Sequence, residues 1–216
     1  MFISGIPLWV AATNTWVIAP EKGGPAVIVD APPDVVGIAD FLAEHDLIPV
    51  ALLVSHGHVD HVGGAGGVAR RYSISAYVHP DDEYLYSDPV AQLRQLWGFE
   101  PPGDYAPPEH WEFLEDGTSL ELAGIEFEVL HTPGHTPGHC CFHVAGEGVL
   151  FSADQLFAGS IGRTDLPGGD YETLMASMRD RIIPLDSATE VFPGHGATTT
   201  LAAELATNPF LQEFRA

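Results

Sequence analysis

The sequence contains few basic residues, although acidic residues are abundant. Eight Lys and Arg residues stand against thirty Asp and Glu residues, and the formal net charge is −22 over 216 residues. A surface field of this sign repels phosphate backbones and anionic membranes. The composition therefore predicts that neither a nucleic acid nor a membrane is a partner of this protein.

Cysteines and long apolar runs are also scarce. The only two cysteines, Cys140 and Cys141, are adjacent, and neighbouring side chains of a strand point to opposite faces, so the pair does not predict a shared disulfide. No stretch approaches the ~20 apolar residues that span a bilayer, and the first residues lack the basic segment of a signal peptide. We therefore expect a cytoplasmic protein with a single domain over residues 1–216.

Short β-prone runs and helical patterns alternate in the first part of the chain. Residues 16–18 and 26–29 flank a turn-rich segment and predict a hairpin. Asp34 can cap a helix whose apolar residues recur at helical spacing. A continuous apolar run at residues 49–54 predicts a strand buried on both faces, and it leads directly into a histidine-rich segment. This order indicates an α/β fold.

The rest of the chain continues this pattern with one interruption. Residues 63–72 and 75–78 predict a second β-α-β unit. Residues 81–110 are rich in proline and aromatic residues, and we interpret them as a variable insertion or lid. Further elements are expected at residues 119–122, 125–130, 140–144 and 149–152 (strands), 170–181 (a helix), 190–192 (a strand) and 201–206 (a helix). This order is compatible with two stacked sheets covered by helices.

A dense group of possible metal ligands follows the apolar run. Residues 56–61 read His-Gly-His-Val-Asp-His, so four imidazole or carboxylate side chains lie within six residues. One short loop cannot direct all four at a single ion, but His56 and His58 can face one ion while Asp60 and His61 face another. Imidazole and carboxylate ligands suit zinc, iron or manganese better than calcium. Because four buried polar groups without a ligand would be costly, the segment predicts metal binding.

This H-x-H-x-D-H segment resembles the signature of the metallo-β-lactamase superfamily. Three later motifs match that superfamily in the same order: His135 in Thr-Pro-Gly-His-Thr, Asp154 in Phe-Ser-Ala-Asp and His195 in Pro-Gly-His-Gly. Together the four motifs extend over nearly the whole chain. The resemblance implies an α/β fold of the four-layer αββα sandwich type, with the site at the edge of two sheets.

The resemblance also implies a set of metal ligands. Two divalent metal ions are implied, most naturally zinc, with iron or manganese as alternatives. One ion would be held by His56, His58 and His135, the other by Asp60, His61 and His195, with Asp154 bridging both. A hydroxide shared by the two ions would be the nucleophile, so Asp60 and Asp154 are also the expected catalytic residues.

Within the superfamily, residues 156–170 and 193–210 are similar to the small bacterial glyoxalase II-like branch. This similarity implies a metal-dependent hydrolase, a thioesterase whose substrate is a small-molecule acyl-thioester such as a hydroxyacyl-thiol. The thiol leaving group has a free pKa of about 8.5, so its departure needs no strong general acid. One departure from the family pattern is Ala153, where a glycine usually precedes the bridging aspartate.

A second interpretation within the same superfamily stays open. Mononuclear iron persulfide dioxygenases also carry a Gly-Arg-Thr-Asp segment, found here at residues 162–165. They are expected to use one Fe(II) held by two histidines and a carboxylate, here His56, His135 and Asp154 or a close variant. A binding module that has lost turnover fits less well, because every ligand position is filled. No feature of the sequence predicts an oligomeric state.

The sequence also predicts roles for several polar residues outside the motifs. Asp30 is a candidate acceptor for the second N–H of a ligating histidine. Arg163 is expected to pair with Asp165. Arg163 is also the only basic residue near a ligand motif, so few cations are available to bind an anionic thiol carrier. We therefore expect a neutral or weakly charged carrier. Both cysteines are expected to pack in the core. Six histidines are predicted not to bind metal: His45, His79, His110, His131, His139 and His143.

Overall fold

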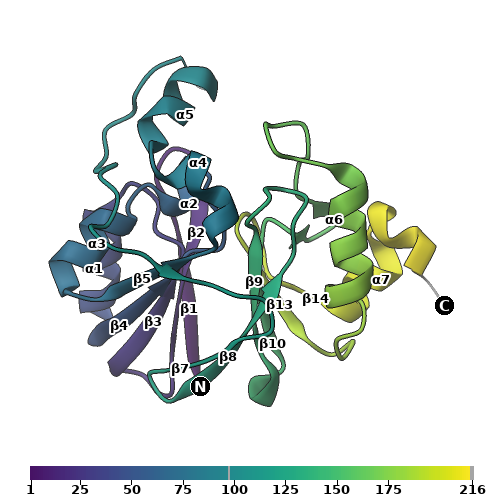
Figure 1. Cartoon of the computed structure of the whole chain (residues 1–216). Coiled ribbons are helices and arrows are strands. Elements are labelled where there is room, and N and C mark those ends of the chain that lie inside the picture. Colours follow the sequence, from purple (N-terminus) through teal and green to yellow (C-terminus); the bar gives the residue numbers. More distant parts are fainter. Residues whose placement is uncertain (97, 215–216) are drawn as a thin grey trace. The chain divides into compact units, whose positions relative to one another are not determined.

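The computed structural model describes residues 1–96 and 98–214. Its chain divides into two compact units, one formed by Met1–Leu114 with Glu121–Ile125 and the other by Glu115–Leu120 with Glu126–Ala216. Each unit has its own six-stranded sheet and its own helices (Figure 1). The single domain over residues 1–216 stays a prediction.

The first unit is built on a mixed sheet in the order β1-β2-β3-β4-β5-β6. Its first three strands are antiparallel, whereas β3 to β6 run parallel. The strands are β1 (Phe2–Leu8), β2 (Thr13–Ala19), β3 (Gly24–Val29), β4 (Leu47–Leu53), β5 (Ser75–Val78) and β6 (Glu112–Phe113). The predicted hairpin is present. The strand predicted at residues 49–54 is also present as β4, but it is not buried on both faces throughout, because Val50 is exposed. The parallel order of β3, β4 and β5 agrees with the predicted βα units.

Helices α1 and α3 pack on this sheet and bury its apolar side chains. Ile38 and Leu42 of α1 and Val68 of α3 share a buried cluster with Ile28 and Leu52 of the sheet. The helices of this unit are α1 (Val35–Glu44), α2 (Val59–Val62), α3 (Ala65–Tyr72), η1 (Pro80–Asp82), α4 (Glu83–Tyr86) and α5 (Pro89–Leu96). Asp34 caps α1 as predicted, because its Oδ1 accepts a hydrogen bond of 2.9 Å from Gly37 N.

Segment 81–110 is more regular than the sequence predicted. It contains α4 and α5 in place of an irregular lid (Figure 1). Pro89 is the first residue of α5, where a proline disturbs no helical hydrogen bond. The proline content that suggested a lid is therefore compatible with a helix.

The second unit is built on a sheet in the order β14-β13-β10-β9-β8-β7, drawn in teal to yellow in Figure 1. Strands β10 and β13 are parallel, and β8, β9 and β10 are antiparallel neighbours. The strands are β7 (Ser119–Leu122), β8 (Ile125–His131), β9 (Cys140–Val144), β10 (Val149–Ala153), β13 (Glu190–Pro193) and β14 (Thr199–Thr200). A small separate hairpin is formed by β11 (Leu156–Phe157) and β12 (Ser160–Ile161).

Helices α6 and α7 pack on the sheet of the second unit. Leu174 of α6 and Leu201 of α7 share a buried cluster with Leu150 and Val191 of the strands. The helices here are η2 (Ala145–Glu147), α6 (Tyr171–Ser177), the π-helical turn η3 (Met178–Ile182), α7 (Leu201–Thr207) and η4 (Pro209–Phe214). Asp170 caps α6 as predicted, since its Oδ1 accepts a hydrogen bond of 2.8 Å from Thr173 N.

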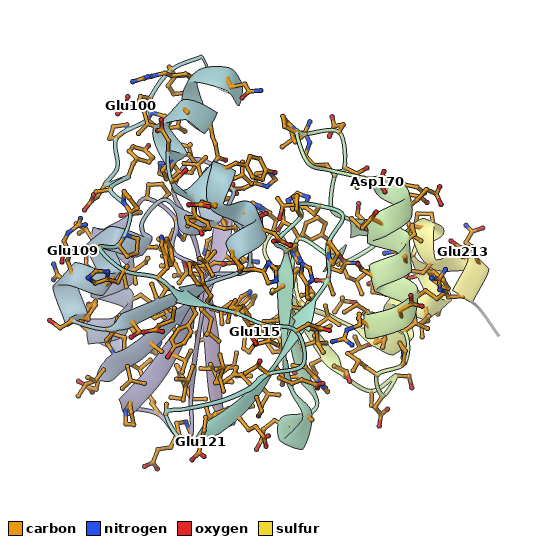
Figure 2. The ribbon with its side chains drawn as sticks, viewed as in Figure 1. Glu100, Glu109, Glu115, Glu121, Asp170 and Glu213 are labelled. Carbon is orange, nitrogen blue, oxygen red and sulfur yellow. The ribbon has the colours of Figure 1, made fainter. Side chains whose placement is uncertain are left out.

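Acidic side chains are exposed on both units. Figure 2 labels six of them, all of which are exposed: Glu100, Glu109, Glu115, Glu121, Asp170 and Glu213. Among the residues that the structure describes, no helix is both long and apolar enough to span a membrane.

Candidate metal centre

In the first unit, the four predicted ligands lie together where the chain leaves β4 and enters α2. His56, His58 and His61 are buried, and Asp60 is half-buried. His56 Nε2 lies 3.1 Å from His58 Nδ1, and His61 Nε2 lies 3.4 Å from Asp60 Oδ2. The four side chains therefore lie in the two pairs that the sequence predicted, His56 with His58 and Asp60 with His61.

These separations suit ligands of a metal ion. Two donor atoms bound tetrahedrally at the usual zinc distances lie ~3.3 Å apart, because each bond measures about 2.0–2.2 Å. The donor set, imidazole nitrogens with carboxylate oxygens, is also the one that zinc, iron and manganese accept. Residues 56–61 of the first unit therefore fit the implied metals both in chemistry and in spacing.

Asp30 lies behind this cluster and fixes the rings of two histidines. Its Oδ2 accepts hydrogen bonds of 2.8 Å from His61 Nδ1 and from Ser55 Oγ, while Oδ1 accepts one of 2.8 Å from Ser55 N. Because a carboxylate only accepts, the proton of His61 lies on Nδ1, and its Nε2 keeps a lone pair for a metal. Asp30 therefore accepts a hydrogen bond from one of the predicted ligands, as expected, while the ligand role of His61 stays a prediction.

Ser55 extends this support to His56. Its hydroxyl hydrogen is donated to Asp30, so its oxygen accepts from His56 Nδ1 at 2.9 Å. His56 Nε2 is then left with a lone pair, like that of His61. On the other side of the cluster, Thr13 Oγ1 donates a hydrogen bond of 2.8 Å to Asp60 Oδ2 and fixes that carboxylate.

In the second unit, the three predicted ligands come from three separate turns that follow β8, β10 and β13. His135 Nε2 lies 3.4 Å from Asp154 Oδ2, and His195 Nε2 lies 3.7 Å from the same oxygen. One carboxylate oxygen therefore faces two imidazole nitrogens at spacings that suit shared metal coordination. This is the arrangement expected of a bridging carboxylate.

Backbone groups orient the ligands of the second unit. His135 Nδ1 donates a hydrogen bond of 2.7 Å to the carbonyl of Arg163, which leaves its Nε2 with a lone pair. The close approach of His135 to the Arg163 carbonyl requires a glycine at position 162. A Cβ there would overlap the carbonyl oxygen of Asp154 and lie 3.1 Å from His135 Nδ1. Asp154 N donates to His139 Nε2 at 3.2 Å, so His139 supports the backbone of a predicted ligand.

Ala153 precedes Asp154 in an unusual backbone conformation. Its φ is +43°, in the left-handed region that favours glycine. This explains in physical terms why a glycine is usual at that position in the family pattern. The alanine methyl does not prevent Asp154 from lying between His135 and His195.

Other expectations from the sequence are met by the structure. Arg163 and Asp165 form an exposed bidentate ion pair of 2.7 and 2.8 Å, and this pairing lowers the pKa of Asp165 to about 2. Cys140 and Cys141 are buried thiols, and burial raises the pKa of Cys141 to about 12. His131 Nε2 donates a hydrogen bond of 2.8 Å to the carbonyl of Pro137, and the prediction that His131 does not bind metal stays a prediction.

Several supporting residues were missed by sequence reasoning. Ser55 and Thr13 belong to no motif, and Gly162 was noted only as the start of the Gly-Arg-Thr-Asp segment. The supporting roles of all three depend on contacts with residues far away in the chain. Asp82 and Gln92 bind the backbone of residues 57–59 but fall in the segment that was interpreted as a lid. Only the position of Ser55, directly before the first ligand, gave a signal that could have identified it.

Comparison with known proteins agrees with these observations. Residues 8–195 match the sequence model of the metallo-β-lactamase superfamily. The hydroxyacylglutathione hydrolase GloC of Haemophilus influenzae is 38% identical over 211 residues, which cover 98% of each chain.

Two solved structures are similar over nearly the full length. BLEG-1, described as a B3 metallo-β-lactamase, has a TM-score of 0.88 at 38% identity and covers 97% of this chain and 99% of its own. TTHA1623, crystallised in a di-iron-bound form, has a TM-score of 0.85 at 38% identity. The match covers 96% of this chain and 100% of TTHA1623. The predicted α/β fold of the metallo-β-lactamase type is therefore confirmed, and the chain belongs to the metallo-β-lactamase superfamily as a metallo-hydrolase.

Proposed function

We propose that this protein is a dinuclear metallo-hydrolase that cleaves a hydroxyacyl-thioester into an acid and a thiol. The observation that carries the proposal is the position of Asp154, whose Oδ2 faces both His135 Nε2 and His195 Nε2. A carboxylate placed in this way suits a bridge between two ions. The 38% identity to a hydroxyacylglutathione hydrolase supports the thioester as the substrate class.

The ligand assignment that we propose is the one that the resemblance to the superfamily implies. One ion would take His56, His58 and His135, the other Asp60, His61 and His195, and both would share Asp154. Zinc is the proposed metal, and iron is the alternative that the di-iron form of TTHA1623 supports. Two such ions supply Lewis acidity and lower the pKa of bound water towards ~7, which makes it nucleophilic.

The chain's own residues contribute orientation and charge. Asp30 and Ser55 keep the protons of His56 and His61 on Nδ1, and the Arg163 carbonyl does the same for His135. Thr13 fixes the carboxylate of Asp60, which we propose as a catalytic residue together with Asp154. A thiolate leaves without a proton donor, so hydrolysis of a thioester requires no general acid in addition to these residues.

The surface and the cysteines support the remaining parts of the proposal. The exposed acidic residues of both units favour a small-molecule substrate over a nucleic acid or an anionic membrane (Figure 2). The two buried thiols suit a reducing compartment, and we propose that the protein is cytoplasmic.

Metal analysis beside two activity assays tests the proposed function. We expect two metal ions per chain in metal-replete protein, together with hydrolysis of a hydroxyacyl-thioester. Oxygen consumption should be measured in parallel with a persulfide substrate. A single iron per chain, with oxygen consumption and no thioester hydrolysis, would replace the proposal with the dioxygenase interpretation.

A further inference from the structure

The backbone of residues 57–59 is bound by two side chains that no ligand motif includes. Gly57 N donates a hydrogen bond of 2.7 Å to Asp82 Oδ2, and Val59 N donates one of 3.0 Å to Gln92 Oε1. Gln92 Nε2 donates in return to the carbonyl of Gly57 at 2.9 Å. Both side chains are buried, with exposed fractions of 0% for Asp82 and 6% for Gln92.

The amide of Gln92 can adopt only one orientation in this network. Its Nε2 also donates a hydrogen bond of 3.0 Å to the carbonyl of Leu85, so both amide hydrogens bind carbonyl oxygens while Oε1 binds an N–H. A flipped amide would place its oxygen against two carbonyls and its hydrogens against an N–H. Gln92 thereby joins α4, α5 and the loop of residues 56–61, which we call the metal loop.

Close packing accompanies these hydrogen bonds. A Cβ on Gly57 would lie 2.7 Å from Leu85 Cβ and 2.9 Å from Asp82 Cβ, so no side chain fits at this position. Val59, inside the metal loop, packs with Leu93 of α5 and with Tyr105. The metal loop is therefore in contact with residues 82–93 through both polar and apolar groups.

We propose that Asp82 and Gln92 are positioning residues for metal binding. They fix the backbone at Gly57 and Val59, on both sides of His58, and so fix the directions of His56 and His58. Because coupling between two sites is reciprocal, a metal ion on the loop also stabilises α4 and α5. This inference rests on the proposed metal centre and adds a role for a segment outside it.

Gln92→Glu is the substitution that tests the proposal. It keeps the shape of the side chain but places an oxygen against the carbonyls of Gly57 and Leu85. Gln95→Glu is the matched control, since Gln95 is exposed on the same helix and undergoes the same change of charge. In a chelator competition, we expect Gln92→Glu to weaken zinc binding at least about tenfold and Gln95→Glu to leave it unchanged.

Hydrogen exchange of the wild-type chain gives a second readout that needs no variant. Zinc should slow exchange at the amides of residues 83–96, and this protection should be smaller in Gln92→Glu. Two results would overturn this inference without affecting the proposed function. One is equal zinc affinity in the two variants. The other is hydrogen exchange at residues 83–96 that does not respond to zinc in the wild type. A wild-type chain that binds no zinc, iron or manganese would instead overturn the proposed function as well.

Discussion

The two units support their predicted ligands in different ways. In the first unit, four predicted ligands lie within six residues, and the side chains of Asp30, Ser55 and Thr13 orient three of them. In the second unit, three ligands come from turns that are far apart in the chain, and one is oriented by a backbone carbonyl. The first unit therefore depends on the identity of its supporting side chains, whereas the second depends on the course of its backbone.

This difference predicts which substitutions each cluster tolerates. Removing a supporting side chain should weaken the first cluster even where the backbone is unchanged. In the second unit, removing a side chain that neither serves as a proposed ligand nor holds the backbone beside one should have little effect. Changes that alter this course should be the damaging ones.

The largest effect is expected for Asp154→Asn, which changes the carboxylate that faces both His135 and His195. An amide cannot bridge two cations as a carboxylate does, so we expect loss of one or both metals. The thioesterase rate should fall by about 1000-fold or more, equivalent to ~4 kcal/mol. Metal analysis and kcat/KM measure both effects, with His110→Ala, at an exposed position, as the control. Small and equal effects in the two variants would show that the site is misplaced.

Asp30→Asn should have the next largest effect, because it changes only a supporting side chain of the first unit. With its oxygen on Ser55 N, the amide would point its hydrogens at Ser55 Oγ and His61 Nδ1, which both donate to Asp30. We expect metal affinity to fall by about 10–100-fold. Asn tolerates the left-handed conformation of residue 30, where φ is +63°, so the backbone need not change.

The exposed Asp40 gives a matched control for this substitution. Asp40→Asn makes the same change of charge on α1 but should leave metal affinity as in the wild type. Isothermal titration of both variants with zinc provides the comparison. If the two variants bind zinc equally well, side-chain support is not what distinguishes the first unit.

Gly162→Ala and Arg163→Ala test the backbone dependence of the second unit. The Cβ of an alanine at residue 162 would overlap the carbonyl of Asp154, so we expect metal affinity to fall about tenfold. Arg163→Ala removes the ion pair to Asp165 but keeps the carbonyl that binds His135, and metal content should be unchanged. Loss of metal in Arg163→Ala with none in Gly162→Ala would reverse the comparison.

A smaller effect is expected from the charge of the thiol carrier. Arg163 already pairs with Asp165, and the net charge of −22 slows the approach of anions. At low salt, a neutral acyl-thiol should therefore have a kcat/KM about threefold or more above that of a matched glutathione ester. A clear preference for the glutathione ester would exclude the charge argument and leave the hydrolase assignment intact.

Local patterns in the sequence predicted much of the fold. Asp34 and Asp170 were identified as helix caps, because short acidic side chains bind the free N–H groups of a first turn. The order of strands and helices followed from apolar periodicity. By contrast, α4 and α5 were missed, because proline was interpreted as a helix breaker although Pro89 begins α5. The short strands β6, β11, β12 and β14 have too few residues to show a pattern.

The candidate site was predictable to a different extent in each unit. The ligands of residues 56–61 could be proposed from chemistry alone, since they are contiguous. His135, Asp154 and His195 were predicted only through the family resemblance, because no local pattern separates them from other histidines and aspartates. The supporting roles of Thr13, Gln92 and Gly162 could not be predicted, since hydrogen bonds and close approaches between distant segments form only in the folded chain.

Asp30 has a consequence for the order in which the ions are taken up. Through Oδ2 it orients His61 directly and His56 by way of Ser55, and these two histidines are proposed to serve different ions. An ion that orders one of these two rings therefore also restricts the other ring. Both rings are held by Asp30 Oδ2, His61 directly and His56 through Ser55. A chain built in this way should fill its two positions cooperatively, with half-loaded molecules scarce at every metal concentration.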